Sequence, residues 1–258
     1  MKEPIIFDGI EKCKVESFCR KLWQPSDDEI KSIIESRWKE LEEKNRKADG
    51  TLSNNKKVRV NMMYVLDKVL YLQLQLTDYK THVATRDDPS ISENQRGLAL
   101  YVIASIISRD NYLVYGKTLS SEEQYKGMIN VIAGAVEPEQ VRIGEGLEET
   151  LFTEIREETG QMSDTIEHYQ PFFVIREQIA AHPSVVHIVK SYLKREDMEK
   201  IFQEHMINLN RKRERPEIEE LLFLPYNKRS MDILNRYRTH ERTKITLNFM
   251  LDHIDIFN

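Results

Sequence analysis

Hydrophobic residues near the N-terminus recur every three or four positions, which predicts an amphipathic helix. The segment 26–44 reads SDDEIKSIIESRWKELEEK, and its apolar residues fall on one helical face. These residues are Ile30, Ile33, Ile34, Trp38 and Leu41. Ser26 followed by Glu29 fits a capping box, in which each side chain accepts a hydrogen bond from an amide at the open helix end. We therefore predict that the helix starts near this pair.

The next two segments alternate apolar and polar positions with a period of two, which is typical of strands. The apolar positions are Val58, Val60, Met62, Leu70, Leu72, Leu74 and Leu76. Asp67 and Lys68 lie near the predicted turn between the two strands. The polar segment 77–97 is predicted to be a connection. It suggests an N-terminal subdomain at 1–90, built of a helix and a β-hairpin, followed by a domain at 91–258.

The rest of the chain mixes strand-like and helix-like segments. Residues 98–118 predict two strands with a turn at Arg109–Asn111, and a further strand in 126–138 enters a turn at Gly134. Other strands are predicted at 171–178, 185–193 and 220–226, and helices at 144–160, 198–209 and 228–254. Because strands and helices are mixed and neighbouring strands often form hairpins, we predict an α+β fold with a mixed sheet flanked by helices.

Composition and charge describe an ordinary soluble globular protein. The chain has 258 residues, 40% of them hydrophobic and 31% charged, with a formal net charge of -5. This charge argues against a broad nucleic-acid-binding face. No segment approaches the roughly 20 consecutive apolar residues of a membrane helix, and no signal peptide is recognised. Cys13 and Cys19 are too few for a disulfide framework, so we expect a cytoplasmic protein.

The predicted helix at 144–160 is rich in glutamate. Glu154, Glu157 and Glu158 are spaced so that they share a helical face, and Glu145 can reach the same region from the preceding loop. A separate apolar stripe can hold the helix against a sheet. It consists of Leu147, Leu151 and Ile155. Converging carboxylates suit Mg²⁺, which prefers oxygen ligands and commonly bridges to phosphates. The competing interpretation is a solvated acidic face.

The segment GEGLEETLFTEIREETGQ, residues 144–161, resembles the Nudix box of the Nudix hydrolases, G-x5-E-x7-R-E-U-x-E-E-x-G-U, with U a bulky aliphatic residue. The matching positions are Glu145, Glu154, Ile155, Glu157, Glu158 and Gly160. Thr153 stands where the box has arginine, and Gln161 replaces the final aliphatic residue. The opening glycine is matched only by Gly134, with a longer spacing than the box has.

This resemblance implies an α/β/α sandwich around a mixed sheet, and Mg²⁺- or Mn²⁺-dependent hydrolysis of a nucleoside diphosphate linked to another group. By position it implies that Glu154, Glu157 and Glu158 are metal ligands and that Glu145 supports them, so all four are candidate catalytic residues. In the family, the arginine of the box orients one of its glutamates. Thr153 stands at this position, so the usual orienting residue is missing.

A narrower resemblance covers most of the chain. The segments IESRWKELE, LQLQLTDYKTHVATR, GLALYVIASIISRDNYLVYGK and INVIAGAVEPE, in this order, are similar to the UDP-glucose diphosphatase branch of the Nudix proteins. That branch has an N-terminal subdomain and a box without the usual arginine. The resemblance implies a nucleotide-sugar substrate, UDP-glucose or UDP-galactose, which is split into UMP and hexose 1-phosphate. A homodimer is compatible with it.

Several residues outside the box are candidates for binding the substrate. Tyr79 could stack on a base, and Lys80 and Arg86 could hold phosphates, with Arg96 and Lys117 as weaker candidates. Each could equally be an ordinary loop or strand residue.

Three late acidic residues are candidates for a general base that activates water: Glu217, Glu219 and Glu220. The basic run Arg211–Arg215 could attract an anionic substrate, but a solvated turn is the better interpretation. His182 and His187 do not form a zinc pattern, so no zinc is predicted. Two other functions remain open. One is hydrolysis of ADP-ribose or another nucleoside diphosphate derivative, and the other is a non-catalytic Nudix-fold module that binds a nucleotide.

Overall fold

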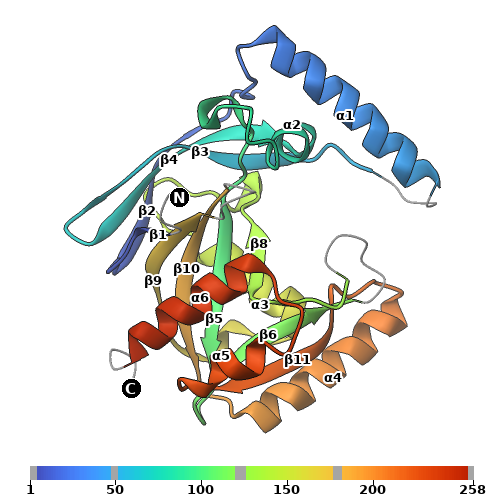
Figure 1. Cartoon of the computed structure of the whole chain (residues 1–258). Helices are drawn as coiled ribbons and strands as arrows, with labels where there is room; N and C mark the ends of the chain where they lie inside the picture. The colour runs from blue at the N-terminus through green and yellow to red at the C-terminus, as the bar shows by residue number, and fades with distance from the viewer. Residues whose placement is uncertain (1–4, 48–51, 120–125, 177–181, 255–258) are drawn as a thin grey trace. The chain divides into compact units, whose positions relative to one another are not determined.

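The alternating segments near the N-terminus form a three-stranded sheet with the order β2-β4-β3 (Figure 1). The computed structural model describes residues 5–47, 52–119, 126–176 and 182–254. The strands are β2 Lys12–Cys19, β3 Lys56–Leu66 and β4 Val69–Asp78. Asp67 and Lys68 have φ of 49° and 62°, as a two-residue turn that follows the twist of a hairpin requires. The predicted hairpin and its turn are confirmed, and β2 adds a parallel strand.

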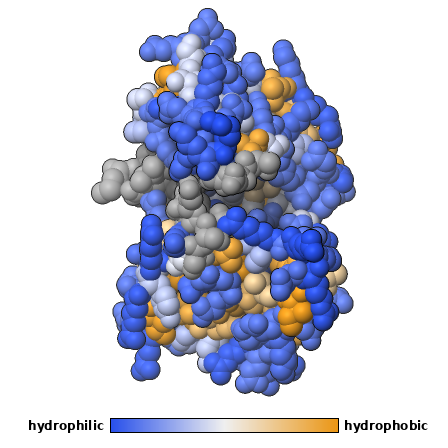
Figure 2. Space-filling view, turned by 90° about the vertical axis from the view of Figure 1, so that its right-hand side faces the viewer, coloured by the Kyte–Doolittle hydropathy of each residue, from blue (hydrophilic) through white to orange (hydrophobic). Residues whose placement is uncertain are grey.

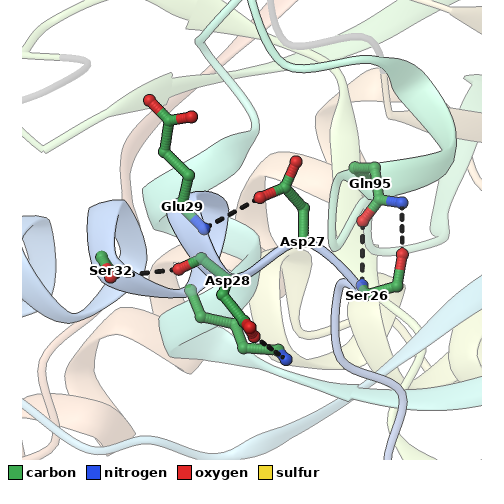
Figure 3. A network of polar contacts seen from close by, with 7 residues as sticks. Ser26, Asp27, Asp28, Glu29, Ser32 and Gln95 are labelled. Carbon is green, nitrogen blue, oxygen red and sulfur yellow. Dashed lines mark hydrogen bonds and ion pairs between the residues drawn. The ribbon is translucent and has the colours of Figure 1, made fainter.

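Helix α1, Asp28–Lys47, confirms the first predicted helix, with Ile34 and Trp38 buried. Its predicted cap is wrong, because the Asp27 carboxylate accepts the Glu29 amide hydrogen at 2.8 Å in place of Ser26 (Figure 3). Ser26 is bonded elsewhere: its amide donates to the Gln95 side chain at 3.0 Å, and its hydroxyl accepts from the same side chain at 2.8 Å. A partner so distant in sequence cannot be inferred from local spacing.

The connection predicted at 77–97 contains helical structure, so that prediction is wrong in part. Helix α2 spans Tyr79–Thr85, and a single 3-10 turn, η1, spans Glu93–Gln95. The side chain of Asp78 caps α2 by accepting the Thr81 amide hydrogen at 2.7 Å. Asp78 is also the last residue of β4, so one residue ends the strand and starts the helix.

The larger sheet contains the strand order β9-β10-β5-β6-β11, with β7 paired to β6 and β8 paired to β5 (Figure 1). The bounds are β5 Tyr101–Ile107, β6 Tyr112–Thr118, β7 Ile129–Asn130, β8 Ile132–Ala135, β9 Ile166–Arg176, β10 Pro183–Ser191 and β11 Ile218–Pro225. Asn111, with φ of 61°, lies in the predicted turn between β5 and β6. The strands expected in these regions are confirmed.

Helices α3 Glu148–Thr159 and α4 Arg195–Lys212 confirm two further predictions. The single C-terminal helix predicted at 228–254 is wrong, because the segment forms α5 Arg229–Leu234 and α6 Glu241–Asp252. Between them the backbone pairs with β7: the Ile129 amide donates to the Arg238 carbonyl at 2.8 Å, and the His240 amide donates to the Ile129 carbonyl at 3.0 Å. These long-range bonds replace the helical ones.

The chain divides into two compact units. The first comprises Met1–Tyr101, Ala135–Leu147 and Arg176–Ser184, and the second comprises Val102–Gly134, Glu148–Ile175 and Val185–Asn258. The first also contains β1 Ile5–Phe7 and the 3-10 turn η2 Pro138–Gln140, and the second contains the turn η3 Ser163–Thr165. The α+β class with a mixed sheet and flanking helices is confirmed. The subdomain boundary at residue 90 stays a prediction.

Helix α6 packs on the larger sheet through aromatic rings, with the Phe249 and Phe173 centroids 4.2 Å apart. Figure 2 shows one face of the molecule, where hydrophilic residues cover most of the visible surface and hydrophobic residues appear in patches between them. In the described part of the chain, no helix combines the length and the apolar character needed to cross a membrane.

Candidate functional site

Helix α3 is held by its apolar stripe, as the sequence predicts. Leu151 and Ile155 in the helix, and Leu147 just before it, are buried. The helix ends at Gly160, whose φ of 75° lies in the left-handed region and whose amide donates to the Arg156 carbonyl at 2.9 Å. With both the buried face and the end fixed, the carboxylates on the other face take defined positions.

The carboxylate of Glu154 lies directly against the backbone of Gly134 in β8. A Cβ atom added to Gly134 would come within 1.9 Å of the Glu154 Cδ atom and 2.0 Å of its Oε1 atom. Only glycine leaves room for this approach. The contact gives Gly134 a physical role that the box spacing alone does not assign, because it seats a glutamate of α3 against the sheet.

Glu158 lies next to Glu154 on the same helical face and is partly buried. Its Oε2 atom accepts the amide hydrogen of Ala133, with a nitrogen–oxygen distance of 3.3 Å. Burial raises the pKa of the Glu158 carboxyl well above its ordinary value, and the negative charges of Glu217 and Glu154 raise it further. Arg242 and the Ala133 amide act in the opposite direction. Three carboxylates therefore repel one another in one small region of the second unit.

These carboxylates open onto a pocket of about 600 Å³ in the second unit. Its acidic lining comes from α3 and from the segment between α4 and β11, and its basic lining comes mainly from the end of α4 and that same segment. The charged lining residues are Glu154, Arg156, Glu157, Glu158, Lys212, Glu214, Arg215 and Glu217. The pocket therefore brings acidic and basic side chains together around a space large enough for a small phosphorylated molecule.

Glu157 is the most exposed of the three predicted metal ligands, with 63% of its side chain accessible. Its carboxylate pairs with Arg156 at 3.7 Å, and its backbone carbonyl accepts a hydrogen bond from His205 Nε2 at 2.9 Å. Within residues 5–47, 52–119, 126–176 and 182–254, no three His, Cys, Asp or Glu side chains gather as a ready ligand set. The metal set of Glu154, Glu157 and Glu158 stays a prediction.

The donor chemistry of the site nevertheless fits a hard divalent cation. Glu154 and Glu158 offer carboxylate oxygens on one helical face, and Glu217 adds a third negative charge. The pKa of Glu158 is raised first by burial and then by these neighbouring negative charges. Glu154 and Glu158 would hold such an ion.

Glu145 lies in the loop before α3, is exposed, and belongs to the first unit. The loop is fixed to β2 by two backbone hydrogen bonds. The Val15 amide donates to the Glu145 carbonyl at 2.7 Å, and the Gly144 amide donates to the Val15 carbonyl at 2.8 Å. The catalytic role of Glu145 stays a prediction.

Tyr79 and Lys80 stand in the first turn of α2, in the first unit. The ring of Tyr79 meets the edge of Trp38 in α1, with centroids 6.3 Å apart. The Lys80 ammonium pairs with Glu35 at 2.5 Å. Both side chains thus join α2 to α1, and their substrate-binding roles stay predictions.

Arg86 and Arg96 also lie in the first unit and have local partners. Arg86 follows α2 and pairs with Asp87 at 3.2 Å. Arg96 is buried, and its Nε atom donates to the Ile91 carbonyl at 2.7 Å. The Arg96 bond orders the loop after α2, so we read this residue as structural in the protein without substrate. The binding roles predicted for both arginines remain predictions.

Lys117 in β6 pairs with Glu219 at 3.0 Å and with Glu220 at 3.3 Å. These ion pairs connect β6 to β11 and involve two of the three candidate bases. Glu217 lines the pocket, and Glu219 and Glu220 are not among its lining residues. Glu217 is therefore the one of the three that the geometry favours as a base. The binding role of Lys117 stays a prediction.

Sequence reasoning missed the parts of the site that come from distant segments. Arg242, in the first turn of α6, is buried, and its Nε atom donates to the Asn130 side chain at 3.0 Å. Its charge partly offsets the raised pKa of Glu158. Lys212 lines the pocket and belongs to the basic run Arg211–Arg215, for which the sequence favours a solvated turn. No local pattern marks Arg242, because it acts through the tertiary fold.

No protein-family model matches the chain, and no curated protein matches it either. Several solved structures resemble it in part. MutT protein from Methanosarcina mazei Go1 is 14% identical, with 61% of this chain and 94% of that chain covered and a TM-score of 0.40. RenU, a Nudix hydrolase from M. smegmatis, is 10% identical, with 65% and 94% covered and a TM-score of 0.41. A C. elegans Ap4A hydrolase is 10% identical, with 61% and 99% covered and a TM-score of 0.37. At these identities and TM-scores the likenesses assign neither family nor activity.

The raised pKa of Glu158 predicts how stability depends on pH in the metal-free protein. The folded state holds this proton more tightly than the unfolded state, so the contribution of Glu158 to stability is greatest at acid pH. That contribution falls as pH rises above the ordinary glutamate value of 4.5 and through the raised one. Thermal unfolding in EDTA between about pH 5 and 8 should show Glu158→Gln gaining on wild type as pH increases. Parallel curves for the two proteins would contradict the pKa shift.

Proposed function

We propose that the chain is a divalent-cation-dependent hydrolase that cleaves the pyrophosphate bond of a nucleoside diphosphate derivative. The observation that carries the proposal is the placement of Glu154, Glu158 and Glu217 in the lining of one pocket, where burial and the charges of Glu154 and Glu217 raise the pKa of Glu158. A cluster that is unfavourable by itself becomes favourable when a cation and an anionic substrate occupy it together.

The basic lining of the same pocket supports an anionic substrate. Lys212 and Arg215 stand at the end of α4 and in the segment before β11, while the acidic residues come from α3 and from that same segment, which contributes Glu214 and Glu217. A diphosphate bound between the two groups would meet positive side chains on one side and cation-bridged carboxylates on the other. Guanidinium and ammonium groups are the usual protein partners of phosphate oxygens.

The reaction adds one water molecule across the pyrophosphate. Water attacks one phosphorus, the bond from that phosphorus to the bridging oxygen breaks, and two phosphate monoesters leave. We propose that Glu217 takes the proton from the attacking water, and its place in the pocket lining together with its electrostatic effect on Glu158 supports this role. A bound Mg²⁺ would supply charge neutralisation at the phosphoryl oxygens. Glu154, seated against Gly134, keeps one acidic group in a fixed position.

The proposed substrate is a UDP-hexose, which would yield UMP and hexose 1-phosphate. This narrower proposal rests on the order of the segments that resemble UDP-glucose diphosphatases, and on the Nudix-like spacing of Glu145, Glu154, Glu157 and Glu158. ADP-ribose belongs to the same reaction class and is separated from UDP-hexoses by a substrate panel.

Product analysis tests the proposal. UDP-glucose, UDP-galactose and ADP-ribose are each incubated with the protein and Mg²⁺, and the products are separated by ion-exchange chromatography. We expect UMP and hexose 1-phosphate in equal amounts from the UDP-sugars, with no release in EDTA. Metal-dependent binding of UDP-glucose without turnover would instead identify a nucleotide-binding module. Turnover of ADP-ribose alone would keep the reaction class and overturn the proposed sugar nucleotide.

A further inference from the structure

Arg59 in β3 carries a buried positive charge in the first unit. The residue is only 8% exposed, and burial lowers its pKa to about 10, which still leaves the guanidinium charged at neutral pH. Its backbone lies between Gln75 of β4 and Ala99, so the surrounding sheet holds it in place. A charge at such a position is costly unless another group compensates for it.

No carboxylate compensates for this charge in the part of the chain that the structure describes. The guanidinium of Arg59 makes no hydrogen bond or ion pair there, and its Nε atom is sealed from solvent without a partner. Lys57, two residues earlier on the same face of β3, is different, because Glu137 lies 2.5 Å from its ammonium. Glu137 therefore neutralises Lys57, and the positive charge of Arg59 has no acidic partner.

An aromatic ring holds the guanidinium of Arg59 in place. The Cζ atom lies 3.9 Å from the centroid of the Trp23 ring, and Trp23 keeps part of its surface exposed. Stacking on tryptophan stabilises a cation and fixes the plane of the guanidinium, but it satisfies none of its N–H donors. Unlike Nε, the two terminal nitrogens of Arg59 are not buried without a partner, so they keep access to solvent.

Arg195 also stacks on an aromatic ring, but its positive charge is paired with a carboxylate. Its Cζ atom lies 4.5 Å from the centroid of the Tyr112 ring, its side chain is 45% exposed, and Asp110 accepts an ion pair at 3.7 Å. Arg59 has a closer ring, deeper burial and no acid. A guanidinium that binds an anionic ligand needs no acidic partner within the protein, because the ligand supplies the negative charge.

We propose that Arg59, fixed on Trp23, binds a phosphate group through its terminal nitrogens. A planar guanidinium offers paired donors to phosphate oxygens, and a phosphate supplies the negative charge that the buried cation lacks. The phosphate belongs either to a nucleotide or to free inorganic phosphate, and the chemistry at Arg59 is the same in both cases. The inference goes beyond the proposed hydrolase activity, and it does not depend on divalent cations.

Thermal unfolding in EDTA tests the phosphate site independently of catalysis. Inorganic phosphate and UMP are added separately at constant ionic strength, with chloride as the reference anion. We expect phosphate to raise the unfolding temperature of wild type by roughly 3 °C at saturating concentration. Arg59→Gln should lose this rise and should be no less stable than wild type in chloride. Arg195→Gln, the matched control, should keep it.

The two sources of phosphate give different results. A larger rise with UMP than with inorganic phosphate, lost in Arg59→Gln, identifies a nucleotide as the ligand, and equal rises identify free phosphate. The proposal is overturned if neither anion stabilises wild type, or if Arg59→Gln responds as wild type does. If Arg59→Gln is destabilised in chloride and neither phosphate nor UMP stabilises wild type, Arg59 has a structural role only.

A direct optical readout covers the case in which Arg59→Gln does not fold. The chain has two tryptophans, so Trp38→Phe leaves Trp23 as the single reporter under the guanidinium. Phosphate bound to Arg59 should change Trp23 fluorescence with a saturable dependence on concentration. Arg59→Lys keeps the charge but loses the paired donors, so it should weaken this response about 10-fold. No fluorescence change with either anion would contradict the site.

Discussion

Replacing Glu158 by glutamine is expected to lower divalent-cation-dependent hydrolysis of UDP-glucose by on the order of 100-fold or more. Glu158 is partly buried beside Glu154, and its carboxylate lies within range of Glu217. Glutamine keeps the size of the side chain and can still accept the Ala133 amide hydrogen, but it cannot contribute negative charge to a cation. Steady-state kinetics with UDP-glucose and Mg²⁺ measure the effect.

The stability of the same variant should change in the opposite direction. Removing one of three mutually repelling carboxylates should raise the unfolding temperature in EDTA by roughly 2–4 °C, which corresponds to about 1 kcal/mol in a chain of this size. Glu149→Gln is the matched control, since Glu149 is exposed on α3 and lies outside the pocket. It should retain activity near the wild-type level. A Glu158→Gln protein that is fully active, or a Glu149→Gln protein equally impaired, would remove Glu158 from the site.

Gly134→Ala should lower the same activity about 100-fold while leaving the protein folded. The new methyl group would meet the Glu154 carboxylate, whose Cδ atom lies 1.9 Å from the Cβ position. The colliding atoms are the free end of a flexible side chain, so the carboxylate moves and the backbone does not. The substitution displaces a carboxylate of the proposed site without removing it, and the unfolding temperature should change by no more than a few degrees.

A double-mutant cycle separates this effect from general damage to the protein. If Gly134→Ala acts only by displacing the Glu154 carboxylate, it should have little further effect on activity in a Glu154→Gln background. Gly116→Ala gives a useful contrast, because its methyl group would meet the side chain of Ile218 at 2.3 Å and not a glutamate of α3. Gly116→Ala should lower the unfolding temperature more than it lowers activity. Independent, additive losses for Gly134→Ala and Glu154→Gln would refute the seating of Glu154 on Gly134.

Elements specified by local spacing could be predicted from the sequence. The hairpin turn at Asp67–Lys68 and the apolar stripe of α3 depend on residues close together in the chain, and both are confirmed. The capping residue of α1 and the break between α5 and α6 could not be predicted. Gln95 engages Ser26, and β7 pairs with the segment before α6, so both features depend on partners far away in sequence.

The candidate site follows the same division. The face shared by Glu154, Glu157 and Glu158 follows from helical geometry, so the sequence identifies it without knowledge of the fold. The contact of Gly134 with Glu154 and the charge of Arg242 near Glu158 arise only when β8, α3 and α6 are packed together. The unmatched charge of Arg59 is also visible only in the fold, because an arginine in a strand gives no sign of its burial.

The central claim is that the acidic face of α3 binds a divalent cation. Titration of Mn²⁺ into the wild-type protein, followed by the loss of the free-ion signal in electron paramagnetic resonance, measures this directly. We predict uptake of Mn²⁺ that strengthens when a non-hydrolysable UDP-sugar analogue is present and that weakens at least 10-fold in Glu158→Gln. Absence of Mn²⁺ uptake with and without the analogue, or equal uptake by wild type and Glu158→Gln, would contradict the claim.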